Sequence, residues 1–328
     1  SCSALIKYFK WNIVSSRFQR IIHGVLGGVI ILILIIIKII WLRPKTIHYT
    51  SSGSLALLKD YFAVKIANFF QINFVIHWHF GRIPELRKKN NLEWKLLLKV
   101  AKSANTSIVL DNKSCQVLDQ NKVKEVILIP NPISEDMINE EKLFAIDKKS
   151  IEIGTFVFIG HIIPAKGVSE LVKACCLVNS NIKLVLIGPV SKSYKKELIS
   201  FTSQIDTEFI TWTGELLRYD VIKYLHTANA LCLPSYTEGF PNVILEAMAT
   251  GCPVIATNVG AIKDMIFSDE FGNAGICIKP KSVELLTQAL EYMISNPIEV
   301  NQFSNSGYKI VKNKYTLSKI FHEYESVW

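Results

Sequence analysis

The sequence lacks the features that mark disordered, fibrous and dinucleotide-binding chains. It has no internal repeat and no low-complexity tract, and 20% of its 328 residues are charged whereas 49% are apolar. This balance excludes a disordered or fibrous protein, because such chains have too few apolar residues for a core. No G-x-G-x-x-G follows an expected strand and no G-x-x-x-x-G-K-[ST] occurs, which argues against the usual dinucleotide and triphosphate loops.

The sequence also lacks cysteine pairs with the C-x-x-C spacing. The seven cysteines are scattered, none forms a C-x-x-C pair, and most lie in apolar runs such as residues 230–234. This pattern excludes a disulfide framework and predicts reduced core residues in a cytosolic protein. No signal peptide is recognisable, because the long apolar run begins only near Ile21 and no small-residue cleavage site follows it. The chain starts with Ser1 rather than Met, and we expect a truncated N-terminus.

Positive charge is concentrated in one half of the chain. Residues 1–150 contain 22 basic and 11 acidic side chains, whereas residues 151–328 contain 15 and 17. At about 150 residues per domain, the length predicts two domains. A basic half beside a near-neutral half predicts an anionic partner, either a membrane surface or a nucleic acid. Because apolar sequence separates the basic residues and no nucleic-acid module is recognisable, we expect the membrane and no nucleic acid.

One long hydrophobic segment, Ile21–Leu42, includes 13 consecutive residues without a polar side chain. As a helix it would reach about 33 Å, enough to span a bilayer, but His23 and Lys38 interrupt it. Basic residues flank both ends, which suits a helix lying along anionic headgroups. We therefore favour an interfacial or buried helix, with a membrane span as the alternative.

Downstream, short β-branched runs alternate with helix-length segments, as in α/β proteins with parallel sheets. The first half predicts one basic helix over Pro84–Lys102 and strands at residues 46–50, 74–78, 106–110 and 126–129. The second half predicts a complete doubly wound domain of six strands, at residues 155–159, 183–187, 209–213, 230–233, 254–257 and 275–278. A break at Pro130-Asn-Pro132 leads us to place the domains at residues 1–133 and 151–328, with a linker at 134–150.

Signals of ligand binding gather at the carboxyl ends of the strands in the second half. Gly160, Gly188 and Gly214 each follow a strand, where a small residue lets a ligand approach the backbone. Residues 233–257 predict strand, loop, helix and strand, with Glu238 in the loop and Glu246 on the helix. Both carboxylates thus lie at the ligand-binding edge, and we expect them to face one elongated ligand. Solvated glutamates are the alternative, which fits Glu246 poorly because an unpaired carboxylate in an apolar run is costly.

The run EGFPNVILEAMATGCPV from Glu238 to Val254, with Gly160-x5-Lys166-Gly167 upstream, closely resembles the group 1 family of retaining glycosyltransferases. The resemblance covers the chain from Thr46 onward and is strong over residues 151–278. It implies the GT-B fold, in which two Rossmann-like domains face a cleft and the C-terminal one holds a nucleotide-sugar donor. The family's opening strand and glycine-rich loop are not recognisable in residues 1–45, so we expect an incomplete N-terminal domain.

The resemblance also implies roles for single residues. Glu238 would bind the sugar hydroxyls of the donor, Glu246 the ribose hydroxyls and Lys166 the diphosphate, whose developing charge a lysine neutralises. The sequence has no D-x-D, so we expect no divalent ion at the diphosphate and no other cofactor. Further donor-site residues implied by the match and by the strand ends are Gly160, His161, Gly214, Gly239, Phe240, Pro241 and Asn242.

Histidines occupy two further places that bear on the site. The family commonly has Gly-Arg where this chain has Gly160-His161, so we expect the second cation for the diphosphate from His161 or from Arg82. Residues 75–82 resemble a family strand that ends in a His-Gly loop beside the reacting sugar. We favour His79 as the active-site residue and His77 as the second choice. The alternatives are a pair of structural histidines or an opportunistic metal-binding pair.

These observations together predict a membrane-associated retaining glycosyltransferase that is metal-independent. It would move a hexosyl or N-acetylhexosaminyl group from a nucleoside diphosphate sugar to a lipid-linked saccharide or polysaccharide acceptor, as in surface polysaccharide biosynthesis. We expect it in the cytoplasm, peripheral on the inner face of the cell membrane. Two alternatives are a GT-B phosphorylase or epimerase, and a non-catalytic nucleotide-sugar-binding or scaffold protein of the same fold.

Overall fold

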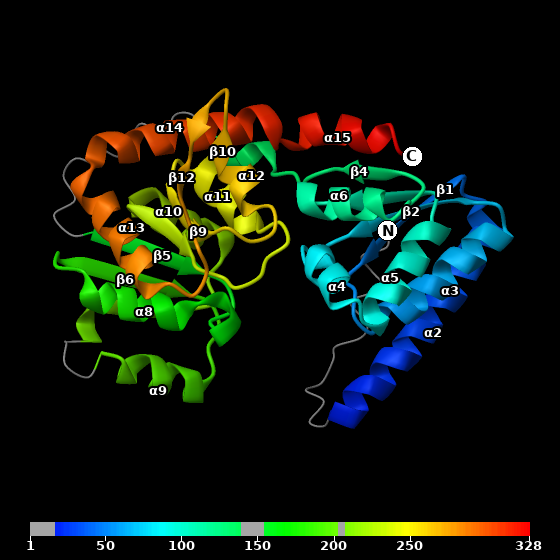
Figure 1. The fold of residues 1–328 in the computed structure, drawn as a ribbon, viewed down its shortest axis with the longest axis horizontal. Coiled ribbons are helices and arrows are strands. Elements are labelled where there is room, and N and C mark those ends of the chain that lie inside the picture. Colours follow the sequence, from blue (N-terminus) through cyan, green and yellow to red (C-terminus); the bar gives the residue numbers. More distant parts are fainter. Residues whose placement is uncertain (1–16, 139–153, 203–206) are drawn as a thin grey trace.

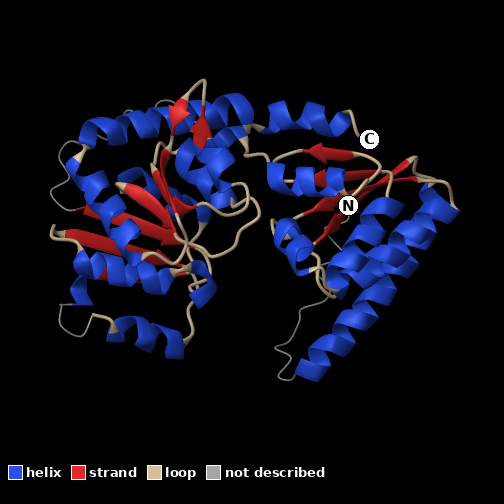
Figure 2. Ribbon diagram, in the orientation of Figure 1, coloured by secondary structure: helices blue, strands red, loops and turns tan. Residues whose placement is uncertain are grey.

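A computed structural model of the chain describes residues 17–138, 154–202 and 207–328. Two separate parallel sheets, each accompanied by helices, form two domains that lie next to each other (Figures 1 and 2). A two-stranded antiparallel ribbon, β10 (Phe267–Ser268) and β11 (Gly272–Asn273), adds to the second domain and was not expected from the sequence. Because parallel strands end at the same sheet edge, this architecture collects loops from many strands at one place.

The N-terminal sheet has four strands in sequential order, and every neighbouring pair is parallel. The four strands predicted in this half are confirmed as β1 (Thr46–Ser51), β2 (Asn73–Trp78), β3 (Thr106–Val109) and β4 (Val126–Leu128). Alternate residues of β2 face opposite sides, so Phe74, Ile76 and Trp78 join one core while Val75 joins another. The helices that pack into the first of these cores include α3 (Ala56–Phe69), α5 (Leu92–Ser103) and α6 (Asn112–Gln120).

The single helix predicted over Pro84–Lys102 is wrong. The chain forms α4 (Ile83–Lys89) and α5, and Asn90 between them adopts a left-handed backbone with φ of 46°. The side chain of Asn91 then accepts a hydrogen bond from the backbone N–H of Trp94 and starts the second helix. Asparagine tolerates the left-handed region and is a strong N-cap, so the Asn-Asn pair ends one helix and begins the next.

The long apolar segment forms α2 (Arg17–Leu42), which packs along the outer side of α3 (Figure 1). Its contact face includes Gly28, Leu32, Ile35 and Ile39, at the spacing of one helix face. Within the described residues, no helix combines the length and the apolar character needed to cross a membrane.

The C-terminal sheet has six parallel strands in the order β12-β9-β8-β5-β6-β7. The strand order reverses between β5 and β8, because the chain runs outward from β5 to β7 and then places β8 on the other side of β5. A doubly wound sheet has a ligand-binding crevice at such a reversal. The six predicted strands are confirmed as β5 (Gly154–Ile159), β6 (Ile182–Ile187), β7 (Ile210–Gly214), β8 (Ala230–Leu233), β9 (Val254–Thr257) and β12 (Gly275–Ile278). The helices of this domain are α8 (Val168–Leu177), α9 (Lys192–Ser200), α10 (Arg218–Thr227), α11 (Asn242–Ala249), α12 (Ile262–Ile266), α13 (Val283–Ser295) and α14 (Pro297–Lys314).

Two segments pass between the domains and pair with each other. The backbone N–H of Ile133 donates to the carbonyl of Tyr315 at 2.7 Å, and the N–H of Leu317 donates to the carbonyl of Ile133 at 2.9 Å. Helix α15 (Leu317–Glu325) then returns to the N-terminal sheet, where Ile320 packs against its second core (Figure 1). The domain boundaries stay a prediction, because most of the expected linker lies outside the described residues.

Candidate functional site

The loop between β8 and α11 holds Glu238 beside a lysine from another loop. Glu238 Oε1 accepts hydrogen bonds from Lys166 Nζ and from Ser235 Oγ, both at 2.6 Å. The carboxylate side chain is 11% exposed and that of Lys166 is 29% exposed. A carboxylate this close to a cation and a hydroxyl is an acceptor that is already oriented, with part of its surface still open to a ligand.

The position of Lys166 follows from the glycine after it. Gly167 adopts φ of 69°, and a Cβ atom there would lie 2.1 Å from the carbonyl oxygen of Pro234. The loop therefore packs directly on the end of β8, and the N–H of Tyr236 donates to the carbonyl of Ala165 at 3.0 Å. A larger residue would lift the Lys-Gly loop away from Glu238, which gives a physical reason for glycine after the lysine.

Glu246 lines a separate cavity of about 470 Å³ between α11, α10 and the connection between the domains. Burial raises the pKa of Glu246 above its usual range, and the nearby Arg218 guanidinium partly opposes this shift. The other residues around the cavity come from both domains or their connection, and they are Pro132, Ile133, Ser134, Ile159, Leu216, Val221, Asn242 and Leu245. A carboxylate and a guanidinium among apolar walls suit a ligand with hydroxyls at one end and a flat apolar ring at the other.

Among the site residues that the sequence reasoning missed are Ser235, Leu216 and Arg218. Ser235 follows β8 by two positions, and Leu216 and Arg218 follow β7 by a few positions. All three lie at the carboxyl edge of the sheet, where the predicted strands alone would have placed them.

A loop of the N-terminal domain touches the Glu238 loop. A Cβ atom on Gly81 would lie 2.3 Å from the carbonyl oxygen of Glu238, and one on Gly239 would lie 2.9 Å from the backbone nitrogen of Gly81. Gly260, from the loop after β9, approaches the same carbonyl, at 2.4 Å from its notional Cβ. Three glycines therefore let the backbones of both domains meet at the candidate site.

The two predicted histidines occupy different environments. His79 is exposed at the end of β2, two residues before Gly81, whereas His77 is 2% exposed. Their ring centroids are 4.0 Å apart. Burial, followed by the neighbouring His79 and His48, lowers the pKa of His77 to about 3, and partial burial lowers the pKa of His79. Both rings are therefore neutral at neutral pH.

Hydrogen bonds define which nitrogen of His77 holds its proton. Trp328 Nε1 donates to His48 Nδ1 at 2.9 Å, so the proton of neutral His48 lies on Nε2. His48 Nε2 in turn donates to His77 Nδ1 at 3.3 Å. The proton of His77 then lies on Nε2, a buried atom for which no partner is found in the described part of the chain.

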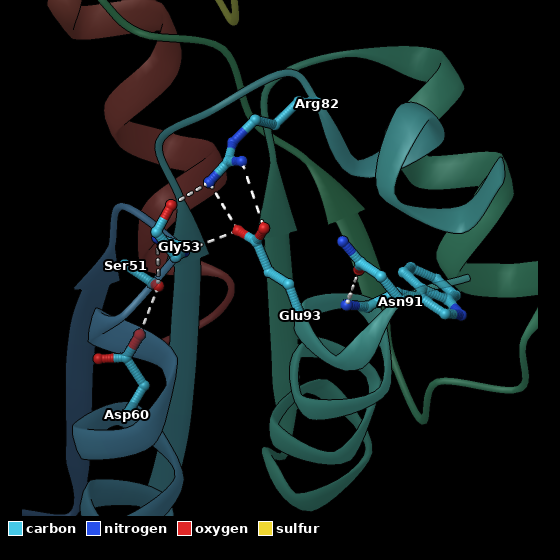
Figure 3. A network of polar contacts seen from close by, with 8 residues as sticks. Ser51, Gly53, Asp60, Arg82, Asn91 and Glu93 are labelled. Atoms are coloured by element: carbon cyan, nitrogen blue, oxygen red, sulfur yellow. Dashed lines mark hydrogen bonds and ion pairs between the residues drawn. The ribbon is translucent and has the colours of Figure 1, made fainter. Parts of the chain in front are cut away.

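The side chain of Arg82 binds other residues of the N-terminal domain (Figure 3). Its Nη2 atom lies 2.7 Å from Glu93 Oε1 and 2.5 Å from Ser54 Oγ, and the N–H of Ser54 donates to the same carboxylate oxygen. A second branch of the network in Figure 3 joins Gly53 to Ser51 and Ser51 to the buried carboxylate of Asp60. The guanidinium thus fastens the loop after β2 to α5 and to the loop after β1.

The remaining predicted donor-site residues surround the same edge of the C-terminal sheet. His161 and Gly214 are exposed, Phe240 is buried, and Pro241 is the N-cap of α11. A Cβ on Gly188 would lie 2.0 Å from the carbonyl oxygen of Gly160. The Oδ1 atom of Asn242 accepts a hydrogen bond from Asn131 at 3.0 Å. In the residues that the structure defines, no group of three His, Cys, Asp or Glu side chains is arranged to hold a metal ion.

Comparison with sequence families gives a match over more than half of the chain. A model described as glycosyl transferases group 1 matches residues 139–310. An uncharacterized glycosyltransferase of Haemophilus influenzae is 27% identical over 212 residues, which are 63% of this chain and 56% of that protein. The capsular polysaccharide biosynthesis glycosyltransferase CapM of Staphylococcus aureus is 28% identical over 196 residues, which are 58% and 48%. The match thus spans about half the length of these relatives.

Solved structures share the two-domain architecture. Sucrose-phosphate synthase from Thermosynechococcus elongatus superposes with a TM-score of 0.74 at 17% identity, covering 90% of this chain and 76% of the other. Anabaena Alr3699/HepE, in complex with UDP and glucose, gives 0.71 at 17% identity, with 86% and 77% covered. The predicted GT-B fold is confirmed by this similarity together with the two Rossmann-like sheets.

Proposed function

The chain belongs to the family of glycosyl transferases group 1, and on this premise we propose that it moves a sugar from a nucleoside diphosphate sugar to a saccharide acceptor with retention of the anomeric configuration. The observation that supports this proposal best is the Lys166–Glu238 pair, which lies where loops of the two domains meet. A cation for phosphate oxygens and a carboxylate for sugar hydroxyls are adjacent there, as transfer from a sugar diphosphate requires.

The donor is proposed to lie along the carboxyl edge of the C-terminal sheet. Its nucleoside would occupy the cavity of about 470 Å³, with the ribose hydroxyls donating to Glu246. Its diphosphate would reach Lys166, and Glu238 would then accept hydrogen bonds from the transferred sugar. The similarity to HepE, which was solved with UDP and glucose, supports a donor of this chemical class, a hexosyl or N-acetylhexosaminyl nucleotide.

The reaction itself needs few protein groups. The acceptor hydroxyl oxygen bonds to the anomeric carbon on the face from which the phosphate leaves, and the bond from that carbon to the phosphate oxygen breaks. The hydroxyl proton passes to the departing β-phosphate, whose charge Lys166 stabilises. Neutral His79, on the loop that reaches Gly81, would hydrogen-bond to the reacting sugar, and neither a metal nor a cofactor is part of the proposal.

The acceptor is proposed to be a lipid-linked saccharide of a surface polysaccharide. The similarity to CapM, a capsular polysaccharide biosynthesis glycosyltransferase, supports this class. The basic N-terminal half supports an acceptor presented at an anionic membrane surface.

The test measures nucleoside diphosphate release from a panel of nucleotide sugars, with membrane lipid extract as the acceptor. Glu238→Gln keeps the size of the side chain but removes its charge, and we expect kcat to fall by about 10²- to 10³-fold. The matched control is Glu197→Gln, an exposed glutamate of α9, which should retain the wild-type rate. Wild-type release by Glu238→Gln would disprove the role of Glu238, and donor binding without release from any donor would favour a non-catalytic protein.

A further inference from the structure

From residue 26 to its end, most of the surface of α2 has no partner in the described part of the chain. It contacts α3 through the narrow face that includes Gly28 and Ile39, and a Cβ on Gly28 would lie 3.6 Å from Lys59 Cβ. A helix that is apolar on all sides is normally buried. From residue 26 onward, however, ten large apolar side chains of α2 are exposed, namely Leu26, Val29, Ile30, Ile31, Ile33, Leu34, Ile37, Ile40, Trp41 and Leu42.

A second apolar stripe continues this surface on α3. Leu55, Leu58, Phe62 and Phe69 are spaced three, four and seven residues apart, so they lie on one face of the helix. All four side chains are at least half exposed. This face is opposite the buried side of α3 and adjoins Lys59, which contacts α2. Figure 1 shows α2 and α3 lying side by side on the outer side of the domain.

The segment that forms this surface and the helices next to it is strongly one-sided in charge. Residues 26–105, which include most of α2 together with α3, α4 and α5, contain 12 basic and 3 acidic side chains. Two of the three acids are paired with cations, Asp60 with Lys59 and Glu93 with Arg82. Trp41 lies in the last turn of α2, and two cations, Arg43 and Lys45, follow the helix, which is the order typical of a helix that ends at the headgroup level.

We propose that α2 and the outer stripe of α3 form a docking surface for a bilayer that contains anionic lipids. The apolar side chains enter the boundary between headgroups and acyl chains, and the surrounding lysines and arginines contact lipid phosphates. A second copy of the chain fits this surface poorly, because two faces of the same positive charge repel each other. Docking would bring the candidate site to a lipid-linked acceptor, and only this purpose of the docking surface rests on the proposed function.

The test is co-flotation of the full chain with phosphatidylcholine vesicles, with and without phosphatidylglycerol. We expect binding to the anionic vesicles that weakens at high salt, because exposed charge interactions are screened. Leu58→Ser with Phe62→Ser should lower the partition coefficient at least tenfold. The matched control is Leu177→Ser with Ile298→Ser, two residues of the C-terminal domain with similar exposure, which should bind as the wild type does.

A charge variant tests the second half of the proposal. Lys65 on α3, and Lys95 and Lys102 on the adjoining α5, are exposed. Neutralising all three to glutamine should lower the partition coefficient about a hundredfold, since each cation near the surface contributes about one power of ten or slightly less. The control neutralises three exposed lysines of the other domain, Lys192, Lys196 and Lys309. Circular dichroism and thermal unfolding of each variant separate lost binding from lost folding.

The outcomes separate docking from catalysis. Equal binding by the wild type and by the Leu58/Phe62 variant would overturn the docking surface, even if sugar transfer proceeds. Self-association in place of vesicle binding would overturn it in favour of a second copy. Vesicle binding that depends on these residues would support it, even if the wild type releases no nucleoside diphosphate and the proposed function fails.

Discussion

Glu238 and Lys166 illustrate how one pair of residues joins two loops of the sheet edge. The carboxylate also accepts from Ser235, so it is fixed from both sides, by the Lys-Gly loop and by its own loop. In the proposed reaction a diphosphate competes for Lys166, and Glu238 then becomes free to accept hydrogen bonds from the sugar. The pair therefore keeps both groups oriented before the donor binds, which lowers the cost of arranging them in the transition state.

Burial of His77 makes the stability of the protein depend on pH. The pKa of His77 is about 3 in the folded protein, compared with about 6.5 for an unperturbed histidine. The unfolded chain thus takes up a proton that the folded chain does not, so this contribution to stability is complete above about pH 6.5 and is lost as the pH falls towards 3. In that window we expect the free energy of unfolding to fall by about 1.4 kcal/mol per pH unit from this residue.

Urea unfolding between about pH 7 and pH 5 measures this effect. His77→Asn retains an oxygen that can accept the hydrogen bond from His48 Nε2 but removes the titrating ring, so its stability should fall less steeply. His322→Asn, at an exposed position on α15, is the matched control and should keep the wild-type slope. Parallel slopes for the wild type and His77→Asn would refute the assignment.

At the scale of helices and strands, the sequence was most informative where the hydrophobic pattern was strongest. All ten predicted strands of the two parallel sheets are present, because buried parallel strands read as short apolar runs between turn residues. The break in the helix at Asn90-Asn91 was missed, because apolar spacing continues across it and only the capping chemistry reveals it. The placement of α15 on the first domain could not be predicted, because it depends on contacts between residues far apart in sequence.

In the candidate site, too, the elements set by the strand pattern were predictable, whereas the contacts between residues far apart in sequence were not. The loop of Glu238 and the helix of Glu246 were predictable, since both follow from the strand pattern of residues 233–257. The partner of Arg82 was not, because its contacts with Glu93 and Ser54 join three separate elements. A charged residue in a loop can reach many partners, and the sequence does not rank them.

The network of Arg82 predicts that shape matters more than charge at this position. Arg82 binds Glu93 and Ser54 through a planar fork, which lysine cannot reproduce. We expect Arg82→Lys and Arg82→Gln to lower kcat to a similar extent, about tenfold, with little change in the KM for the donor, because the loop of His79 and Gly81 shifts. Steady-state kinetics with the donor varied measures both parameters.

The alternative role of Arg82 gives a different result. If Arg82 is the second cation for the diphosphate, Arg82→Lys should keep most of the activity and Arg82→Gln should raise the KM for the donor. Glu93→Gln serves as the matched control, because it breaks the same network from α5 without removing a cation. Full activity of Glu93→Gln would argue against the positioning role.

For the whole molecule, the contact between the two domains at Gly81 and Gly239 leaves no room for a side chain. The notional Cβ of Gly81 lies 2.3 Å from a backbone oxygen, so Gly81→Ala forces the loops apart. We expect kcat/KM to fall about a hundredfold, because small displacements of reacting groups are costly, while the melting temperature changes little. Nucleoside diphosphate release and thermal unfolding measure the two quantities.

Gly27→Ala is the control for this variant. Gly27 lies in α2, and a Cβ there would meet no other heavy atom within 4 Å. The control should therefore have wild-type activity. If Gly81→Ala also keeps wild-type activity, the contact of the two loops is not part of the active arrangement.

The return of α15 to the first domain has a consequence for how the protein is made. Thr46 at the start of β1 donates a hydrogen bond to the carbonyl of Trp328, 282 positions away. Until α15 has emerged from the ribosome, Val75 and Ile108 on that face of the sheet have no helix to cover them. At about 5 to 20 residues per second, that interval lasts some tens of seconds. Chaperones that bind exposed apolar surface therefore have a long opportunity to hold the nascent N-terminal domain.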